Sequence, residues 1–372
     1  MRPETMPHLF YQGDNLVGLR LLAQRGIRAD LVYIDPPFAT NNEFLVDADR
    51  ANSVSASGRL AYSDTTRGSD YLDALKFRLC AIREVTSPTG SIYVHIGVNM
   101  EHHVRLLMDE VFGPRNFRNS ITRIKSNPKN FDRYSYGNIK DTILFYSFSP
   151  SRITWNPQRT PLNEDDLKRL YPRVDADGRR YTTTPLHAPG VTRDGPTGQR
   201  WRGVRPPRGR HWRYPPERLQ ELDDGGLIHW SATGNPRKIN YADESGGKMP
   251  QDIWEYKDPQ RPLYPTQKNA DMLERIILTS SNPGDTVMDC YAGSGSALVE
   301  AARLRRRFIG MDDAPESHRV IRQRMKDISL TPGTEEDFAT FEPSYPEQPY
   351  ISKRSVSHNA MRQYPFHATI PS

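Results

Sequence analysis

The stretch LVYIDPPF at residues 31–38 decides the fold, together with the stretch TVMDCYAGSGS at residues 286–296. In both stretches a short apolar run, which is typical of a buried strand, leads directly into an acidic residue and then into rigid or glycine-rich residues. Strands of an open α/β sheet end in loops that bind ligands at the carboxyl edge of the sheet. We therefore expect both stretches to supply loops to one ligand-binding edge, although they lie near opposite ends of the sequence.

The composition excludes several classes of protein. The chain has 372 residues, a net charge of +6, a pI of about 9.2 and only two cysteines, Cys80 and Cys290. A small disulfide-stapled fold is excluded, and a reducing, cytoplasmic compartment is expected. No stretch reaches the roughly 18 apolar residues of a membrane span, and the N-terminus lacks the apolar core of a signal peptide. The mild basicity suits a polyanionic partner without requiring one.

The pattern along the chain divides it into four parts. Residues 8–150 alternate strand-like and helix-like runs, which predicts an α/β fold with a mainly parallel sheet, interrupted by a polar loop at residues 39–66. Residues 151–250 are rich in Arg, Pro, Gly and Trp, which predicts an insertion of loops and short elements. The α/β pattern returns over residues 251–330. Residues 331–372 show no periodicity, and we expect a tail that wraps the surface or is disordered.

The periodicity also predicts individual elements. Strands are expected at residues 9–11, 31–34, 91–96, 142–148, 286–288 and 307–311. Helices are expected at residues 16–22, 71–85, 102–111, 272–278 and 296–304. The turn NPGD at residues 282–285 separates the helix at 272–278 from the strand that leads into Asp289.

The glycine-rich stretch has the form of a ligand-binding loop. Asp289 is followed by Ala-Gly-Ser-Gly-Ser and a helix, so that small residues let a ligand approach backbone N–H groups at the helix start. Such a turn is often only a connector, and it matches neither a Walker loop nor the Gly-x-Gly-x-x-Gly pattern. The next strand ends about twenty residues later at Asp312, where a carboxylate can accept hydrogen bonds from ribose hydroxyls. This spacing favours an adenosine-bearing cofactor.

The stretch Asp35-Pro36-Pro37-Phe38 is more specific. A lone Asp-Pro is usually a turn, but two prolines followed by an aromatic residue indicate a rigid device. The Asp35 carboxylate and the Pro36 carbonyl remain as acceptors, and the Phe38 ring can lie against a planar substrate. This combination fits an exocyclic amino group on a heterocyclic base, whose nitrogen would be aimed at an electrophile.

Taken together, these residues resemble the amino-group DNA methyltransferases of the β arrangement, in which the catalytic motif comes first and the S-adenosylmethionine loop last. The likeness covers roughly residues 8–325 and is strongest toward the Mod subunits of type III restriction-modification systems. The segments YPTQK at 264–268 and SNPGD at 281–285 look like the family's approach to its cofactor loop. The resemblance implies a circularly permuted Rossmann-like methyltransferase sheet with a target-recognition insertion at residues 151–250. Residues 8–150 would be the catalytic half and residues 251–330 the cofactor-binding half.

The resemblance also implies roles for individual residues. The catalytic residues would be Asp35, Pro36, Pro37 and Phe38. The cofactor-binding residues would be Asp14, Thr266, Lys268, Asp289, Ala292, Gly293, Ser294, Gly295 and Asp312. Within this set, Thr266 and Lys268 would hold the methionine carboxylate, Asp312 the ribose and Asp14 the adenine; the residues alone also allow a turn role for Asp14 and a solvated helix start for Lys268. No side chains have the spacing of metal ligands.

Two residues depart from the family pattern, and the second bears on the target base. Asn269 stands where the family often has Pro, and either residue can begin a helix. Phe38 replaces the commoner Tyr, which preserves the stacking face. Because Ser-Pro-Pro-Tyr is favoured by N4-cytosine enzymes of the family, adenine N6 is the expected target and cytosine N4 the alternative. Methylation at cytosine C5 needs a nucleophilic Cys, and neither cysteine follows a proline.

Duplex DNA is the expected substrate, and its target base must be flipped out of the stack. The insertion carries a cluster of arginines interleaved with Trp201, Trp212 and Tyr214: Arg193, Arg200, Arg202, Arg205, Arg208, Arg210, Arg213 and Arg218. Those expected to bind DNA are Arg200, Arg202, Arg205, Arg208 and Arg210. The alternative is that these side chains cap a loop-rich fold. His95 lies on a predicted strand near the sheet end where the pocket is expected, and it is interpreted as a core histidine.

The leading hypothesis is therefore a site-specific DNA methyltransferase that uses S-adenosylmethionine and modifies adenine N6. The alternatives are a methyltransferase that acts on RNA or on a glutamine amide, and a DNA-binding subunit without activity. The order of the motifs argues against the first, and intact Asp35, Gly293 and Asp312 argue against the second. A homodimer, a separate restriction subunit and association with the nucleoid are compatible with this hypothesis. The recognition sequence cannot be read from the arginines.

Overall fold

The computed structural model describes residues 7–37, 42–46, 59–64, 68–128, 134, 136–259, 267–335 and 338–343. The chain divides into two compact units. One unit consists of Met1–Pro157 together with Gln251–Ser372, and the other of Gln158–Pro250. The first unit is thus assembled from two distant parts of the sequence, and the second unit is inserted between them.

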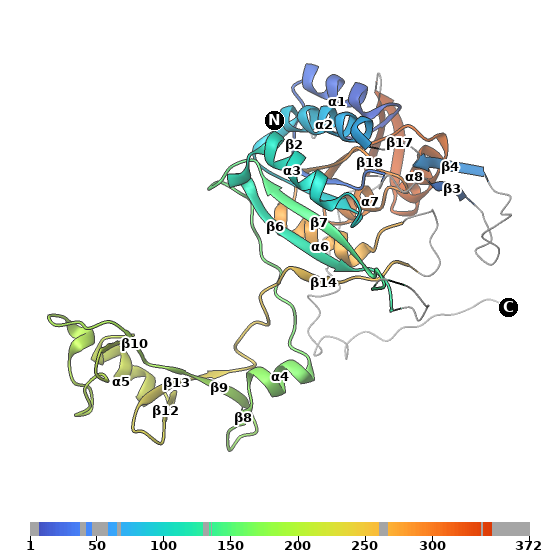
Figure 1. The fold of residues 1–372 in the computed structure, drawn as a ribbon. Coiled ribbons are helices and arrows are strands. Elements are labelled where there is room, and N and C mark those ends of the chain that lie inside the picture. Colours follow the sequence, from blue (N-terminus) through green and yellow to red (C-terminus); the bar gives the residue numbers. More distant parts are fainter. Residues whose placement is uncertain are drawn as a thin grey trace, which may run out of the picture. The chain divides into compact units, whose positions relative to one another are not determined.

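The first unit is built on a mixed sheet (Figure 1). Its central strands, in the order β5-β2-β15-β16-β1, are all parallel. On one side β7 and β6 continue the sheet in antiparallel pairs and β14 pairs parallel with β6, while the hairpin β17–β18 pairs antiparallel with β1 on the other side. Across the sheet, the described strands are β14 (Ile253–Glu255), β6 (Phe117–Ile124), β7 (Lys140–Ser147), β5 (Thr86–Ile96), β2 (Ala29–Ile34), β15 (Thr286–Asp289), β16 (Arg307–Asp312), β1 (His8–Gln12), β18 (Phe338–Pro343) and β17 (Leu330–Glu335).

Both faces of this sheet are covered by helices, which explains why its central strands are apolar throughout. Alternate residues of β2 serve different cores: Val32 packs on one face and Leu31 on the other. The first face is covered by α1 (Asn15–Gln24), α2 (Gly68–Glu84) and α3 (Glu101–Phe112). The second face is covered by α6 (Ala270–Ser280), α7 (Ser296–Arg303) and α8 (Pro315–Asp327). The predicted α/β fold with a parallel-rich sheet is confirmed.

The sheet joins the two distant parts of the sequence at its centre. Strand β15 lies between β2 and β16, with Met288 opposite Val32 on one side and opposite Ile309 on the other. Because all three strands are parallel, the residues that follow them emerge at the same edge. The ends of the two strands at residues 31–34 and 286–289 therefore lie at the same edge of the sheet, as expected from the sequence.

Two predictions about irregular segments are wrong. Within the expected loop at residues 39–66, β3 (Asn42–Val46) and β4 (Arg59–Asp64) form an antiparallel hairpin. Within the expected tail, β17 and β18 form a hairpin that extends the main sheet beside β1. The runs FLV and LAY are too short to signal strands against a polar background, and an edge hairpin depends on its neighbour for hydrogen bonds. Residues 344–372 of the tail lie outside the described residues.

The second unit is a small antiparallel structure around a tryptophan core. A four-stranded sheet runs in the order β12 (Ile228–Trp230), β13 (Pro236–Tyr241), β9 (Arg180–Pro185) and β8 (Arg173–Val174), and β10 (His187–Pro189) pairs with β11 (Arg210–Trp212). The helical segments are α4 (Glu164–Leu170), α5 (Pro216–Asp224) and the 3-10 turn η2 (Pro196–Gly198); a second turn, η1 (Pro114–Asn116), belongs to the first unit. Trp201 and Trp212 are buried with Leu186, Leu219 and Leu222.

Within the described part of the chain, no helix combines the length and the apolar character that crossing a membrane requires.

Candidate active site

Four acidic residues follow four neighbouring strands at the carboxyl edge of the main sheet. Asp35 follows β2, Asp289 ends β15, Asp312 ends β16, and Asp14 comes shortly after β1. The strand registers place these ends side by side, since Gln12 pairs with Asp312. Ligands of open α/β sheets usually bind at the carboxyl ends of the strands, at the topological switch point of the sheet.

Asp35 forms an ion pair with a lysine from a distant part of the sequence. Nζ of Lys268, just before α6, lies 2.6 Å from Oδ2 of Asp35, and the two side chains are 11% and 18% exposed. Oδ1 of Asp35 is buried and accepts no hydrogen bond from any described residue. A buried carboxylate oxygen without a donor is costly unless a ligand supplies one. Oδ2 of Asp35 is therefore held by Lys268, whereas Oδ1 is an open acceptor, that is, a buried oxygen without a hydrogen-bond donor among the described residues.

The rest of the predicted catalytic motif is only partly described. Pro36 is buried and Pro37 is half-buried at the end of β2. Phe38 lies outside the described residues, and so does Thr266. The stacking role of Phe38 and the carboxylate-binding role of Thr266 therefore stay predictions.

The glycine loop after β15 requires its glycines. Gly293 and Gly295 have φ values of 51° and 71°, in the left-handed region that favours glycine. A Cβ atom on Gly295 would lie 2.6 Å from Cγ1 of Ile321 in α8. The loop is closed by a hydrogen bond from Gly295 N to Ala292 O, at 2.7 Å, and Gly295 begins α7. The backbone at Gly295 therefore packs closely against the Ile321 side chain of α8.

Asp312 is tied to the same loop. Its Oδ2 accepts a hydrogen bond from Gly293 N at 2.7 Å, and its Oδ1 accepts one from Ala314 N at 3.0 Å. Burial raises the pKa of Asp312 to about 6. A carboxylate has about four lone-pair sites, so each oxygen can still accept a hydrogen bond from a hydroxyl donor.

Asp289 lies between Asp35 and Asp312 and is fully buried. Its Oδ1 accepts a hydrogen bond from Tyr291 N at 3.0 Å. Burial, together with the neighbouring carboxylates Asp35 and Asp312, raises the pKa of Asp289 well above its usual range. Nearby negative charges disfavour the ionised form of Asp289, whereas a nearby cation would favour it. A positively charged ligand at this edge would therefore stabilise the Asp289 carboxylate.

Asp14 is the start of a helix. Its Oδ1 accepts a hydrogen bond from Leu16 N at 2.8 Å and so caps α1, while its Oδ2 pairs with Arg78 at 2.8 Å. Arg78 also donates to Asn15, whose amide donates to the carbonyl of Cys290 at 2.8 Å. The turn role that the residues allowed for Asp14 is thus present, and the chain of contacts fixes the start of α1 against the loop after β15. Contact with a cofactor adenine stays a prediction.

The remaining predicted cofactor residues have protein partners of their own. Ser294 is buried; its hydroxyl lies 3.0 Å from that of Ser296, and its carbonyl accepts a hydrogen bond from Arg324 at 2.7 Å. Ala292 is buried beside them. Among the described residues, no group of three or more His, Cys, Asp or Glu side chains could hold a metal ion.

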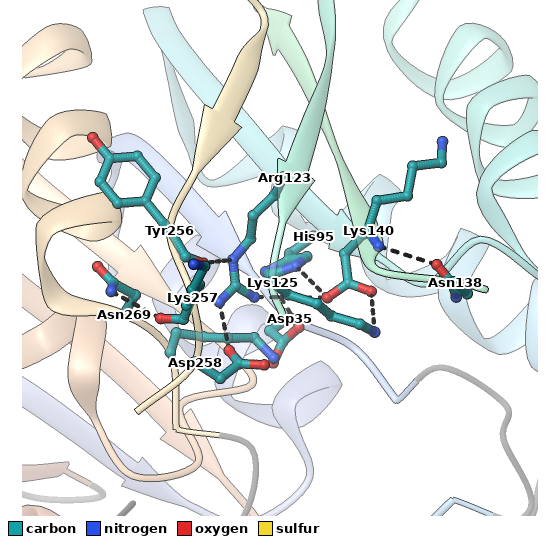
Figure 2. A network of polar contacts seen from close by, with 12 residues as sticks. Asp35, His95, Arg123, Lys125, Asn138, Lys140, Tyr256, Lys257, Asp258 and Asn269 are labelled. Atoms are coloured by element: carbon teal, nitrogen blue, oxygen red, sulfur yellow. Dashed lines mark hydrogen bonds and ion pairs between the residues drawn. The ribbon is translucent and has the colours of Figure 1, made fainter. Parts of the chain in front are cut away.

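A buried polar network lies behind Asp35 (Figure 2). Asp141 on β7 accepts a hydrogen bond from Lys125 at 2.7 Å and lies 3.3 Å from Nε2 of His95. Arg123 on β6 is fully buried; it lies 3.6 Å from Asp141 and donates to the carbonyl of Tyr256 at 2.9 Å. Sequence reasoning missed these charged residues, because the polar composition of β6, FRNSITRI, gives no sign that Arg123 is buried.

The five arginines expected to bind DNA are all exposed on the second unit: Arg200, Arg202, Arg205, Arg208 and Arg210. Three of them have contacts within that unit, since Arg202 pairs with Asp223, Arg200 donates to a carbonyl and Arg210 contacts His187. For Arg205 and Arg208 there is no hydrogen bond or ion pair with any residue that the structure describes. The tryptophans interleaved with them form the core instead.

Comparison with known proteins bears on the family. Residues 29–323 match the model of a family described as DNA methylase. The chain is 40% identical over 328 residues to the type II methyltransferase M.EcaI of Enterobacter cloacae, and the match covers 86% of this chain and 69% of that protein. It is 25% identical over 343 residues to the StyLTI Mod subunit, a type III restriction-modification enzyme of Salmonella typhimurium, with 81% of this chain and 52% of that protein covered.

Among solved structures, the crystal structure of the M1.HpyAVI–SAM complex is similar, with a TM-score of 0.45 and 15% identity over 85% of this chain and 98% of that chain. The chain spans about two thirds of one curated relative and about half of the other. The predicted resemblance to amino-group DNA methyltransferases and Mod subunits is confirmed by the family match and by both relatives. The matched residues run from β2 to α8 and include both halves of the site, and the chain belongs to the DNA methylase family.

Proposed function

We propose that this protein transfers a methyl group from S-adenosylmethionine to the exocyclic N6 of an adenine flipped out of duplex DNA. The observation that carries the proposal is Asp35, whose open Oδ1 lies at the end of β2 next to the glycine loop at the end of β15. An acceptor that is buried and without a donor fits an amino N–H group. The family match supports the same class of reaction.

The residues present fit S-adenosylmethionine. Gly293 is partly exposed in the loop after β15, and Asp312 has acceptor capacity left for ribose hydroxyls. A cationic ligand would also suit Asp289, whose pKa is raised by burial and by the neighbouring carboxylates of Asp35 and Asp312. When bound, S-adenosylmethionine supplies a methyl group on a positively charged sulfur.

The residues of this chain would then act on the amine by position and charge. Oδ1 of Asp35 and the carbonyl of Pro36 would each accept one N–H of the amino group, which directs the nitrogen lone pair out of the base plane. Lys268 fixes Oδ2 of Asp35 at 2.6 Å, so that the carboxylate cannot rotate away from the amine. No covalent bond to the protein is needed.

The choice of adenine rests on Asp35, since the family's N4-cytosine enzymes favour Ser at this position. An amino group on cytosine would be held by the same acceptors, so cytosine N4 is the alternative target. Duplex DNA would be bound in part by the exposed Arg205 and Arg208 of the second unit. A homodimer and a separate restriction subunit are further predictions about the whole protein.

The proposal is tested with S-adenosylmethionine that carries an isotopic label in its methyl group. After incubation with duplex plasmid DNA and digestion to nucleosides, the label should appear in N6-methyladenine. Label in N4-methylcytosine would change the target base, and label in RNA or protein alone would refute DNA methylation. Asp35→Ala should abolish transfer while S-adenosylmethionine still binds; loss of both would make Asp35 a structural residue.

A further inference from the structure

His95 lies behind Asp35, in the centre of the buried network. It is fully buried on β5, between Tyr33 of β2 and Asp141 of β7. Its Nδ1 is 3.0 Å from the hydroxyl of Tyr33, and its Nε2 is 3.3 Å from Oδ2 of Asp141. The same Nδ1 is 3.8 Å from Oδ1 of Asp35, which is too long for a hydrogen bond (Figure 2).

The neighbours of His95 determine which of its nitrogens carries the proton. Burial raises the pKa of Tyr33 well above its usual range, so Tyr33 keeps its hydroxyl proton. Burial also raises the pKa of Asp141, but the imidazole of His95, 3.3 Å away, and the ammonium of Lys125 outweigh burial and hold that pKa well below its usual range. An ionised carboxylate only accepts hydrogen bonds, so Nε2 of His95 must carry a proton.

The other nitrogen of His95 is then an acceptor. Burial lowers the pKa of His95, and the positive charges of Lys268 and Arg123 act in the same direction, whereas Asp141 and Asp35 oppose it. A neutral imidazole with its proton on Nε2 has a lone pair on Nδ1, and the hydroxyl of Tyr33 donates to it. His95 therefore turns an acceptor toward Asp35, and two acceptors cannot bond to each other.

We propose that His95 is a positioning residue for Asp35: its Nε2–H tautomer, held between Asp141 and Tyr33, keeps Oδ1 of Asp35 open for the N–H of the substrate amine. The inference rests on the proposed function, in which Asp35 accepts that N–H. A doubly protonated His95 would have a second donor at Nδ1. That donor would bond to Oδ1 of Asp35 and compete with the amine.

The hydroxyl of Tyr33 is the part of this arrangement that can be removed with least disturbance. In Tyr33→Phe, Nδ1 loses its donor and faces the carboxylate of Asp35, while Nε2 still faces Asp141. A histidine between two carboxylates is favoured in its charged form, so the pKa of His95 should rise. The variant should therefore lose activity at low pH and regain it at high pH.

Tyr93→Phe is the matched control. Tyr93 is as deeply buried as Tyr33 in the same sheet, and its hydroxyl lies 2.8 Å from that of Ser280 on α6. Removing this hydroxyl costs a buried hydrogen bond in which neither His95 nor Asp141 takes part. Any loss common to both variants is a loss of packing or stability.

The test is the pH dependence of kcat/KM for methyl transfer to duplex DNA, measured from about pH 5.5 to 9 on the wild type and both variants. Tyr33→Phe should show a new acidic limb, with about a tenfold loss per pH unit below the raised pKa of His95, and should approach wild type at high pH. Tyr93→Phe should follow the wild-type profile. A Tyr33→Phe profile parallel to wild type, or reduced equally at every pH, would overturn the positioning role.

A second readout does not depend on activity. In a sample with ¹⁵N-labelled histidine, NMR at about pH 7 should show the His95 signal, identified by its loss in His95→Gln, as the neutral form protonated at Nε2. A neutral form protonated at Nδ1, or an imidazolium, would contradict the inference. If the wild type methylates no DNA at any pH but the NMR result holds, the proposed function fails and the tautomer stands.

Discussion

The glycine at the start of α7 offers a sharp test of the loop assigned to the cofactor. Gly295 has a φ of 71°, and a Cβ atom there would lie 2.6 Å from Cγ1 of Ile321. Gly284 has a similar left-handed φ of 89°, but no described atom lies within 4 Å of its Cβ position. Gly295→Ala therefore adds backbone strain and steric overlap, whereas Gly284→Ala adds strain alone.

The expected losses follow from these two contributions. Left-handed backbone costs an alanine about 1–2 kcal/mol, which is the full loss expected for Gly284→Ala. The overlap at Gly295 is about 1 Å inside normal carbon–carbon contact, and overpacking adds about 1–3 kcal/mol. We expect Gly295→Ala to lower the free energy of unfolding by about 2–5 kcal/mol. Because the loop must shift, its affinity for S-adenosylmethionine should fall about tenfold or more, by ~1.4 kcal/mol.

Denaturant unfolding measures the stabilities, and calorimetric titration with S-adenosylmethionine measures the affinities. Ile321→Ala removes the overlapping Cγ1, so in that background Gly295→Ala should cost only the backbone strain of about 1–2 kcal/mol. Gly284→Ala should leave the affinity unchanged. Equal losses for the two glycine variants, or an undiminished cost of Gly295→Ala beside Ile321→Ala, would refute the reasoning.

Three further predictions concern Asp312 and the second unit. Affinity for S-adenosylmethionine should rise as the pH increases through about 6. Burial raises the pKa of Asp312 to about 6, and its carboxylate form accepts hydrogen bonds from ribose hydroxyls better than its protonated form. An affinity that does not change with pH in this range would remove Asp312 from the cofactor site. The same raised pKa means that the folded protein holds this proton more tightly than the unfolded chain, so the contribution of Asp312 to stability is lost as the pH rises from about 4 to about 6. Arg208→Ala should reduce the slope of log K for DNA binding against log salt concentration by about 1. Arg169 is an exposed arginine of the same unit that pairs with Asp166, and Arg169→Ala should leave the slope unchanged. Equal slopes for the two variants would place Arg208 outside the DNA interface.

The elements that could be predicted are those whose signal is local. The apolar runs before Asp35, Asp289 and Asp312 are continuous and end in turn residues, and the structure has strands that reach these positions. The helix that follows Gly295 was expected from its small residues and apolar spacing, and α7 lies there. Each of these features depends on neighbours within a few residues.

The parts that could not be predicted depend on distant partners. Strand β6 carries Arg123, and the buried arginine is tolerable there because Asp258, Asp141 and the carbonyl of Tyr256 surround its guanidinium group. The ion pair between Lys268 and Asp35 joins two residues that are far apart in the sequence, so no spacing rule could reveal it. His95 was interpreted as a core histidine although its strand was expected to end near the pocket, because its contacts with Tyr33, Asp35 and Asp141 appear only in the fold.

The central claim is that residues from both ends of the sequence form one pocket for a methyl donor and an amine. A crystal structure with S-adenosylmethionine tests it most directly. The claim predicts the ribose at Asp312, the backbone of Gly293 against the ligand, and the methyl group directed toward Asp35. S-adenosylmethionine bound elsewhere, or bound here with its methyl group directed away from Asp35, would contradict it.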